Sequence, residues 1–358
     1  MADRYWVGGT GSWNATNLTS WSATSGGAGG ASIPTAVDNV YFDANSGGGT
    51  VTIAVSTRTC LNLSFRGLSG TSDYTGTLAG TVALNISGGL ILSASATYTH
   101  SGIVSFLATS GSNNITSNGR ALASPIIING LGGTFNLTDQ LTTTAAITLT
   151  AGTVNINNGA NVTSSTFSSG VANVRTLNLG SSTWTLTNAG NAWNMSAITN
   201  LTINAGTSRI VFTNTSATLN TFVGGGFTYY TVEYARGGGG GTLNFTGSNV
   251  ITNFIDVNST AAHSITFAAT TSIHRFIVRG SPGQLITVGR SATGTPVITK
   301  IGRGIVCNCD YLNIVSLGFT ASPANTWYAG ANSTGSATGW IMTAPPSSQS
   351  LLGVGGVG

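Results

Sequence analysis

Short stretches in which apolar and polar residues alternate recur along most of the chain. Examples are TVTIAV (Thr50–Val55), TVALNI (Thr81–Ile86) and SRIVFTN (Ser208–Asn214), each bounded by Gly, Asn, Ser or Thr. Successive side chains of a β-strand point to opposite faces, so alternation over about four to eight residues between turn formers predicts half-buried strands. We therefore expect an all-β protein.

This texture continues from about Gly49 to Thr320 without a linker or a shift in composition. A row of β-sandwich domains covering this length needs linkers between the domains. A solenoid buries the apolar face of each coil against its neighbours, so one texture continues for as long as coils are added. We predict a right-handed parallel β-helix, in which coils of about 20–25 residues give roughly a dozen turns.

Four parts of the chain follow from this interpretation. Residues 1–46 form an N-terminal capping segment, residues 47–318 the β-helix, residues 319–344 a C-terminal capping module, and residues 345–358 a Pro/Gly-rich tail. Two interpretations of the tail stay open. It is either a disordered terminus or a peptide that docks on a neighbouring subunit, because its exposed Leu and Val side chains are costly to leave in water.

Composition supports the fold class. Charged residues make up 6% of the chain, against about 25% in an ordinary domain, and Glu233 and Lys300 are its single Glu and its single Lys. Helices depend on such residues, whereas Thr, Ser, Asn and Gly disfavour helix interiors. A hydrophobic content of 41% and a mean hydropathy of +0.24 argue against disorder.

Charge, apolar stretches and cysteine usage exclude several classes of protein. The net charge of +4 comes from scattered Arg residues rather than from a basic cluster, so no nucleic-acid partner is expected. The chain has no apolar stretch of about 18 residues, so no membrane insertion is expected. The opening MADRYWVGG lacks the basic-then-apolar run of a signal peptide. Three cysteines, an odd number, argue against a disulfide framework.

Few residues are candidates for catalysis. Glycoside hydrolysis requires two carboxylates that face one substrate about 5–10 Å apart. Glu233 and Asp256 meet this requirement only if they converge on adjacent coils. Asp38 and Asp43 flank the strand NVYF, where turn and backbone hydrogen bonding is the expected role. No acidic cluster suits a calcium-assisted lyase. We predict a protein that is not an enzyme and has no catalytic residues.

Metal and cofactor binding are not indicated either. Cys307 and Cys309 alternate onto one face of a strand. Because free Cys is among the most buried residue types, these two and Cys60 are expected in the core. The three histidines lack the spacing of a zinc site, and two of them, His263 and His274, are expected in loops or on the surface. We predict no metal and no cofactor.

Two features predict contacts with polar partners. The window FTYYTVEYAR (Phe227–Arg236) is the most aromatic of the chain. Its rings are candidates for glycan binding without cleavage, or else belong to the core: Phe227, Tyr229, Tyr230 and Tyr234. Asn is frequent within strands, as in NINNGANV, and stacked Asn side chains form hydrogen-bonded ladders. We expect these Asn residues to be structural, while rows of Thr and Asn also suit a flat surface for a polysaccharide or a mineral-like lattice.

Two terminal segments resemble a known class of proteins. The opening RYWVGGTGSWNATNLTSWS, followed by SIPTAVDNVYFDANSG, and the closing DYLNIVSLGFTASPANTWYAGANSTGSATGWIMTAPP are similar to the ends of β-solenoid surface and fibre proteins of tailed bacteriophages and related bacterial adhesins. An open β-helix exposes unpaired strand edges at both ends. We predict that aromatic residues cover these ends, with ligand stacking as the alternative: Trp6, Trp13 and Trp21 at one, and Trp327, Tyr328 and Trp340 at the other.

The resemblance implies a structural virion protein, assembled in the host cytoplasm and released with the particle. It implies a fibre, a spike or a capsid decoration that acts in particle stability and host-surface adhesion. The expected partners are further copies of the chain in a homotrimer, other virion proteins and a host surface polysaccharide. Two alternatives remain: a self-assembling extracellular filament or adhesin, and a polysaccharide depolymerase.

Overall fold

The structure, a computed structural model, describes residues 1–68, 71–157, 159–236, 238–257, 260–291, 294–302, 307–315 and 318–346. Within these ranges nearly every regular element is a strand, and the strands pair as the stacked coils of a β-solenoid of about 12 turns. The predicted all-β solenoid is confirmed. The chain divides into unit 1 (Met1–Ser182 and Thr199–Asn204) and unit 2 (Thr183–Ile198 and Ala205–Gly358). From residue 347 onward, the predicted tail lies outside the described residues.

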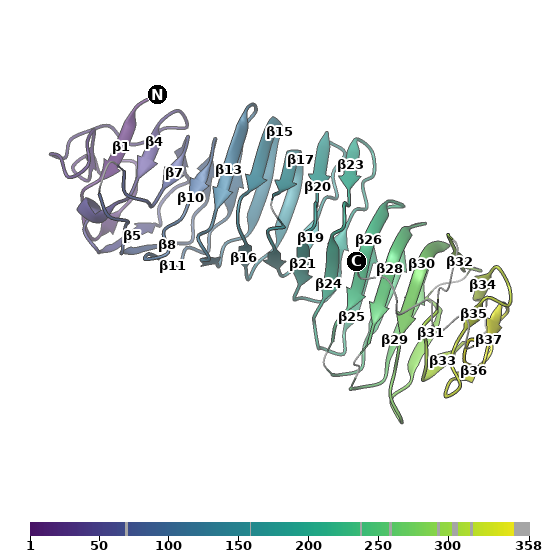
Figure 1. Cartoon of the computed structure of the whole chain (residues 1–358). Helices are drawn as coiled ribbons and strands as arrows, with labels where there is room; N and C mark the ends of the chain where they lie inside the picture. The colour runs from purple at the N-terminus through teal and green to yellow at the C-terminus, as the bar shows by residue number, and fades with distance from the viewer. Residues whose placement is uncertain are drawn as a thin grey trace. The chain divides into compact units, whose positions relative to one another are not determined.

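Unit 1 stacks its strands in chain order, in purple to teal in Figure 1. Its longest parallel ladder, here called the first face, contains β1 (Asp3–Trp6), β4 (Asn39–Tyr41), β7 (Leu63–Ser64), β10 (Leu90–Ile91), β13 (Ser112–Thr116), β15 (Ile126–Leu137), β17 (Ile147–Ile156), β20 (Arg175–Asn178) and β23 (Leu201–Asn204). A second ladder joins β6 (Arg58–Cys60), β9 (Leu84–Ile86), β12 (Val104–Phe106), β15, β17 and β19 (Phe167–Ser168).

Shorter ladders complete the coils of unit 1. One joins β2 (Gly11–Ser12), β5 (Thr50–Ile53), β8 (Thr77–Gly80) and β11 (Thr97–Tyr98). Another joins β14 (Ala121–Leu122), β16 (Leu141–Thr143) and β18 (Val162–Ser164). Strand β3 (Trp21–Ser22) pairs antiparallel with β1, and the 3-10 turn η1 (Ala44–Ser46) is capped by Asp43.

The core of unit 1 consists of rows of apolar side chains in register. On the first face, the inward position of each coil aligns with that of the next, and all members of the row are at most 4% exposed: Val40, Leu63, Leu90, Ile115, Leu137 and Ile156. The coils differ in length, with 19 residues separating the paired Leu137 and Ile156 and 27 separating Leu63 and Leu90. This variation explains why the sequence shows the alternating strands expected of a solenoid but no fixed repeat length.

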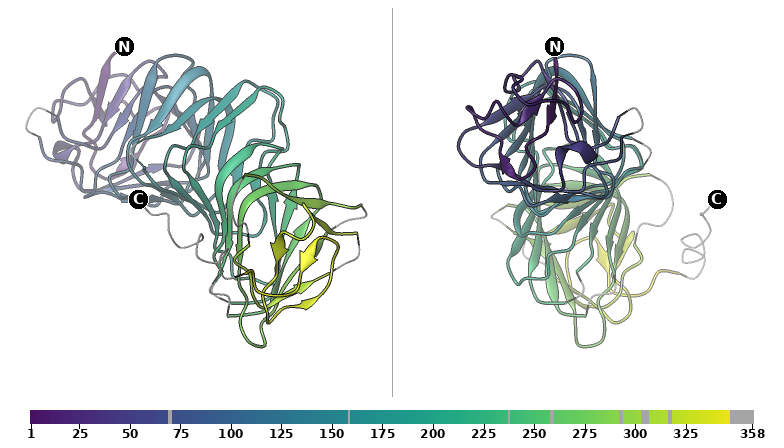
Figure 2. Two further views of the ribbon diagram at one scale, coloured as in Figure 1. Left: turned by 45° about the vertical axis from the view of Figure 1, so that its right-hand side comes forward. Right: turned by 90° about the vertical axis from the view of Figure 1, so that its left-hand side faces the viewer.

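Unit 2 contains two long parallel ladders, in teal to yellow in Figures 1 and 2. One joins β22 (Gly190–Asn194), β25 (Leu219–Val223), β27 (Thr242–Thr246), β29 (His263–Phe267), β31 (Ile286–Arg290), β33 (Leu312–Ile314) and β36 (Thr334–Gly335). The other joins β21 (Thr183–Leu186), β24 (Arg209–Phe212), β26 (Thr228–Tyr234), β28 (Val250–Asp256), β30 (Thr271–Val278), β32 (Val297–Lys300) and β34 (Thr320–Ser322). Strands β35 (Trp327–Tyr328) and β37 (Trp340–Ile341) pair with each other.

Aromatic rings take the place of much of the aliphatic core in unit 2. Phe222, Phe245 and Phe267 occupy aligned positions on three successive strands and are fully buried. The rings of Phe245 and Phe267 stack with centroids 5.1 Å apart. On the opposite ladder, Phe254 and Phe276 stack at 5.5 Å. Stacked rings in register bury large areas and add a specific pairing energy, so they fix the alignment of the coils.

The terminal Trp residues lie in buried aromatic clusters. Trp6, Trp13 and Trp21 are 0% exposed, and all three have ring centroids within about 6 Å of Phe42. At the other end of the sequence, the Trp327 and Trp340 rings lie 5.5 Å apart and both contact Phe276, while Tyr328 is half-buried. Aromatic clusters therefore occupy both predicted capping segments; that they cover the ends of the solenoid stays a prediction.

Candidate functional site

The aromatic window of unit 2 is largely part of the core. Tyr229 and Tyr234 on β26 are 0% exposed, and the Tyr229 hydroxyl donates to the Gly224 carbonyl at 2.8 Å. Tyr230 is 38% exposed and Phe227 is half-buried. Alternate residues of a strand point to opposite faces, which sends Tyr229 inward and Tyr230 outward. Burial removes Tyr229 and Tyr234 from any surface that a glycan contacts, so the hypothesis of a four-ring glycan site is reduced to Tyr230 and Phe227.

Around Tyr234 the structure brings together a buried group of charged side chains. The Nε2 atom of His263 lies 2.6 Å from Oδ2 of Asp256, and both side chains are 1% exposed. The Tyr234 ring packs edge-on against His263 with centroids 5.3 Å apart. Arg236 donates through Nη1 to the Tyr234 hydroxyl at 2.8 Å and through Nη2 to the Ser216 carbonyl at 2.7 Å. The expectation that His263 lies in a loop or on the surface was wrong, because its ring belongs to a buried ion pair at the start of β29.

Both members of this pair bind protons more tightly than usual. Burial lowers the pKa of His263, but the hydrogen bond and the charge of Asp256 outweigh it and raise the pKa above its ordinary value. Burial raises the pKa of Asp256, with the His263 bond opposing. The second ring nitrogen, Nδ1, faces the Ala261 carbonyl at 3.0 Å. Since both ring nitrogens face acceptors, the doubly protonated imidazolium satisfies all the contacts.

The two carboxylates considered for glycan cleavage do not face one another. Glu233 is aligned with Ile255 on the neighbouring strand, so Asp256, the next residue, points to the opposite face of the sheet. Glu233 forms an ion pair with Arg209, whereas Asp256 binds His263. Each carboxylate is held by its own cation, and the arrangement lacks the shared substrate space that paired carboxylates need.

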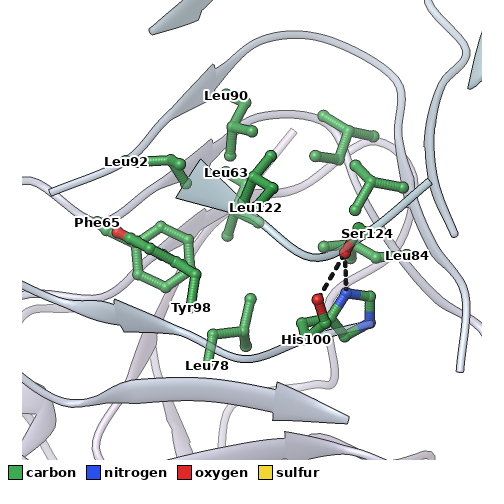
Figure 3. A pocket seen from close by; sticks show the side chains of 12 residues that line it. Leu63, Phe65, Leu78, Leu84, Leu90, Leu92, Tyr98, His100, Leu122 and Ser124 are labelled. Atoms are coloured by element: carbon green, nitrogen blue, oxygen red, sulfur yellow. Dashed lines mark hydrogen bonds between the residues drawn. The ribbon is translucent and has the colours of Figure 1, made fainter. Parts of the chain in front are cut away.

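A small internal cavity in unit 1 has a histidine and a serine side chain in contact at its wall. The cavity has a volume of about 20 Å³ and is lined mainly by Leu side chains, with His100 and Ser124 at one side (Figure 3). Nδ1 of His100 lies 3.0 Å from Oγ of Ser124, and Nε2 lies 2.8 Å from the Val82 carbonyl. Burial lowers the pKa of His100. A space of this size holds about one water molecule, so the pair acts as a buried polar bond rather than as a catalytic dyad.

The cysteines behave as small apolar residues. Cys60, Cys307 and Cys309 are free and buried, as predicted. Burial raises the pKa of the Cys60 thiol and that of Cys307, which keeps both protonated and unreactive. Within the ranges that the structure describes, no group of three or more His, Cys, Asp or Glu side chains is placed to hold a metal ion.

The first face of unit 1 carries a column of amide side chains that runs across its coils. The outward positions that the strand register places in line, here called the Asn column, are Asp3, Asn39, Asn62, Gly89, Asn114, Asn136, Asn155, Asn178 and Asn204. Four consecutive bonds run from the Nδ2 of one residue to the Oδ1 of the previous one, from Asn204 to Asn114, over distances of 2.6 to 3.3 Å. The predicted Asn ladder is therefore present, and it includes Asn155 of the NINNGANV segment.

A row of hydroxyl groups flanks the Asn column two residues earlier on each strand. Its members are Ser112, Thr134, Thr153, Thr176 and Thr202. Residues two apart on a strand lie on the same face, and coils repeat at about 4.8 Å. The face therefore presents hydroxyl and amide groups in a regular two-dimensional array. Alternation and the Asn content of the strands gave a signal for this array, but only the register shows which residues align.

Several buried residues were not anticipated from the sequence. Trp184 and Trp193 form an edge-to-face pair with centroids 5.5 Å apart in the first strands of unit 2, next to Tyr229. Arg175 is 1% exposed and donates to the carbonyls of Asn173, Ser169 and Thr199. The alternation of side chains in a strand gave a signal for Arg175 and Trp184. Each lies two residues before a leucine, Leu177 and Leu186 respectively, and therefore on the same buried face of its strand.

No protein-family model, curated protein or solved structure matches the chain. Within the described ranges, no helix has the length and apolar character of a membrane span. The similarity of the terminal segments to bacteriophage and adhesin solenoids stays a prediction.

Proposed function

We propose that this chain is a structural virion protein of a tailed bacteriophage, present as a fibre, a spike or a capsid decoration, and that it contributes to particle stability and host-surface adhesion. The observation that carries the proposal is the stacking of parallel coils, with apolar rows inside and a hydrogen-bonded amide column outside. Each coil is held by both neighbours, so local opening exposes two ladders at once. Such a stack suits mechanical and adhesive work.

The composition and the terminal segments support the same role. With 6% charged residues and 12 Lys and Arg residues in 358, the chain offers trypsin few cleavage sites. This is an advantage for a protein that functions outside a cell. The aromatic segments at the two ends, with buried Trp13 and Trp327, resemble those of phage solenoids. Other virion proteins and a host surface polysaccharide are the partners that this role requires.

Light scattering and electron microscopy of the purified chain test the proposal. A side-by-side homotrimer gives three times the chain mass of 36.0 kDa and short uniform particles in micrographs. A mass of one chain at micromolar concentration contradicts the trimer. End-to-end filaments favour the alternative of a self-assembling extracellular adhesin instead.

A digestion assay with host surface glycans addresses the depolymerase alternative. We expect no release of oligosaccharides by the wild-type protein. Release that is lost in both Glu233→Gln and Asp256→Asn contradicts a purely structural role.

A further inference from the structure

The Asn column has one position without a side chain. Between Asn62 on β7 and Asn114 on β13, the aligned residue on β10 is Gly89. Its backbone N–H donates to Oδ1 of Asn62 at 2.7 Å, in place of the side-chain bond found elsewhere in the column. A Cβ atom at Gly89 would lie 2.8 Å from the Asn114 carbonyl oxygen, so the backbone packing here excludes larger residues. The column is therefore interrupted by a fixed gap.

A depression of about 350 Å³ opens at this gap. It is lined by three asparagines, two serines, Tyr41 and a few apolar side chains, among them Asn62, Asn113, Asn114, Ser64, Ser112, Leu68 and Ile91. Binding sites for small ligands have volumes of about 300–1,000 Å³ and combine apolar walls with a few polar groups. The depression lies at the lower end of this range, which corresponds to one or two sugar rings.

Tyr41 provides a rigid aromatic wall. Its ring stacks on Tyr5, aligned with it on β1, with centroids 4.8 Å apart and an interplanar angle of 21°. Both rings are half-buried, so little rotamer freedom is left to lose when a ligand binds. Burial raises the pKa of Tyr41, and its hydroxyl therefore stays a neutral donor. The electron-rich face of such a ring attracts the weakly positive C–H groups of a sugar.

The amides at the gap keep hydrogen-bonding capacity for a ligand. Each amide has two N–H donors and two acceptor lone pairs. Asn62 uses one N–H toward Asn39 and one lone pair toward Gly89. Asn114 accepts one bond from Asn136 at 3.3 Å, and among the hydrogen bonds of the described residues its Nδ2 group makes none. The amides of Asn62 and Asn114 therefore offer free donors and acceptors side by side in the depression.

The lining favours one class of ligand over others. It contains no charged side chain, so an anionic glycan or a phosphate finds no counter-charge. The strands beneath are paired on both sides, from β4 through β7 and β10 to β13, so no free strand edge is available for a peptide to extend the sheet. A ligand with adjacent hydroxyl groups, each of which can donate and accept a hydrogen bond, matches the amides of Asn62 and Asn114.

We propose that the Gly89 depression binds a neutral polysaccharide, with one sugar ring against Tyr41 and sugar hydroxyls on the amides of Asn62 and Asn114. The inference rests on the adhesive part of the proposed function and locates the adhesion on the first face of unit 1 rather than at the aromatic window of unit 2.

Affinity electrophoresis of the full chain tests the site, in gels that contain dextran, a galactomannan or a soluble β-glucan, with alginate as the anionic contrast. We expect retardation by at least one neutral polysaccharide and none by alginate. Tyr41→Ala and Asn114→Ala should each weaken the interaction by about tenfold.

Two control variants separate binding from folding. Asn178→Ala removes a residue of the same column that lies away from the depression and makes two side-chain hydrogen bonds, one more than Asn114. Tyr230→Ala removes the exposed ring of the aromatic window of unit 2. Both variants should bind like the wild type. The inference is overturned if Tyr41→Ala and Asn114→Ala bind like the wild type, or if Tyr230→Ala loses binding. It is also overturned if alginate retards the protein, or if no neutral polysaccharide does. A monomer that binds through the depression refutes the proposed trimer alone, whereas a trimer that binds nothing refutes this site alone.

Discussion

The two units of the solenoid use different chemistry for similar coils. Unit 1 aligns neutral amides on its first face, from Asn114 to Asn204, and its buried His100 bonds to a hydroxyl and a carbonyl. Unit 2 stacks phenyl rings in its core and buries an ion pair, Asp256 with His263, beside Arg236. The same stacking of parallel coils therefore tolerates either an uncharged polar column or an internal charge cluster.

This difference teaches that stability in the two units responds to different conditions. Amide ladders do not titrate, and each of their bonds contributes a modest net energy of about 1 kcal/mol. A buried ion pair contributes little over an apolar replacement, but losing one partner is costly because a charge is left without compensation. Substitutions and pH should therefore separate the units experimentally.

The largest effect is expected from the aromatic clusters. Trp21→Ala in unit 1 and Trp193→Ala in unit 2 each remove a fully buried indole, which costs about 3–5 kcal/mol. Hydrogen exchange followed by peptide mass spectrometry should show faster exchange in the unit that carries the substitution. Leu131→Ala, at a 59% exposed position, is the control. Exchange rates that stay at the wild-type level in Trp193→Ala would contradict the burial of this ring.

An effect of about the same size is expected from breaking the buried ion pair. His263→Leu leaves the Asp256 carboxyl buried without its partner and is expected to destabilise unit 2 by about 3–5 kcal/mol. Replacing both residues, as Asp256→Leu with His263→Leu, should restore most of the loss, since an apolar pair of similar volume carries no desolvation cost. Urea unfolding of the single and double variants measures this, and a double variant as unstable as the single one would refute the pairing.

The pH dependence of the two buried histidines should have opposite signs. The pKa of His263 is raised, so its contribution to stability is complete below about pH 6.5 and is lost as the pH rises through the folded value. The pKa of His100 is lowered, so its contribution is complete above about pH 6.5 and is lost as the pH falls through the folded value.

Urea midpoints at pH 5.5 and pH 8.5 for the wild type, His100→Gln and His263→Gln check these signs. His263→Gln should lessen the loss of stability at the higher pH, and His100→Gln the loss at the lower pH. The same shift in both variants would refute the assignment.

The smallest effect is expected in the Asn column. Asn155→Ala breaks the bonds to Asn136 and Asn178 and should destabilise unit 1 by about 1–2 kcal/mol, with no dependence on pH between 5 and 9. Thr153→Ala, in the flanking row, should cost less, because the structure shows the Thr153 position exposed in part and outside the ladder of amides. A cost for Thr153→Ala that equals the cost for Asn155→Ala would show that the ladder bonds contribute nothing.

The sequence allowed the fold and the burial of several side chains to be predicted, but not the candidate site. Alternation in segments such as TVTIAV, together with the near absence of Glu and Lys, indicated stacked strands, and the alternation of Cys307 and Cys309 indicated burial. The depression depends on Tyr41, Gly89 and Asn114, which come from three different coils. Because the coils vary in length, no spacing in the sequence brings these residues together.

What the sequence determined by itself is local. Period-two alternation decides which side chains face inward, and a chain rich in Thr, Asn and Gly forms strands and turns rather than helices. Tertiary structure decided which residues of different coils align, since register is set by the packing of the apolar rows across ladders. That alignment places Gly89 within a column of amides and sends Glu233 and Asp256 to opposite faces, because a shift of a single residue reverses the direction of every side chain in a strand.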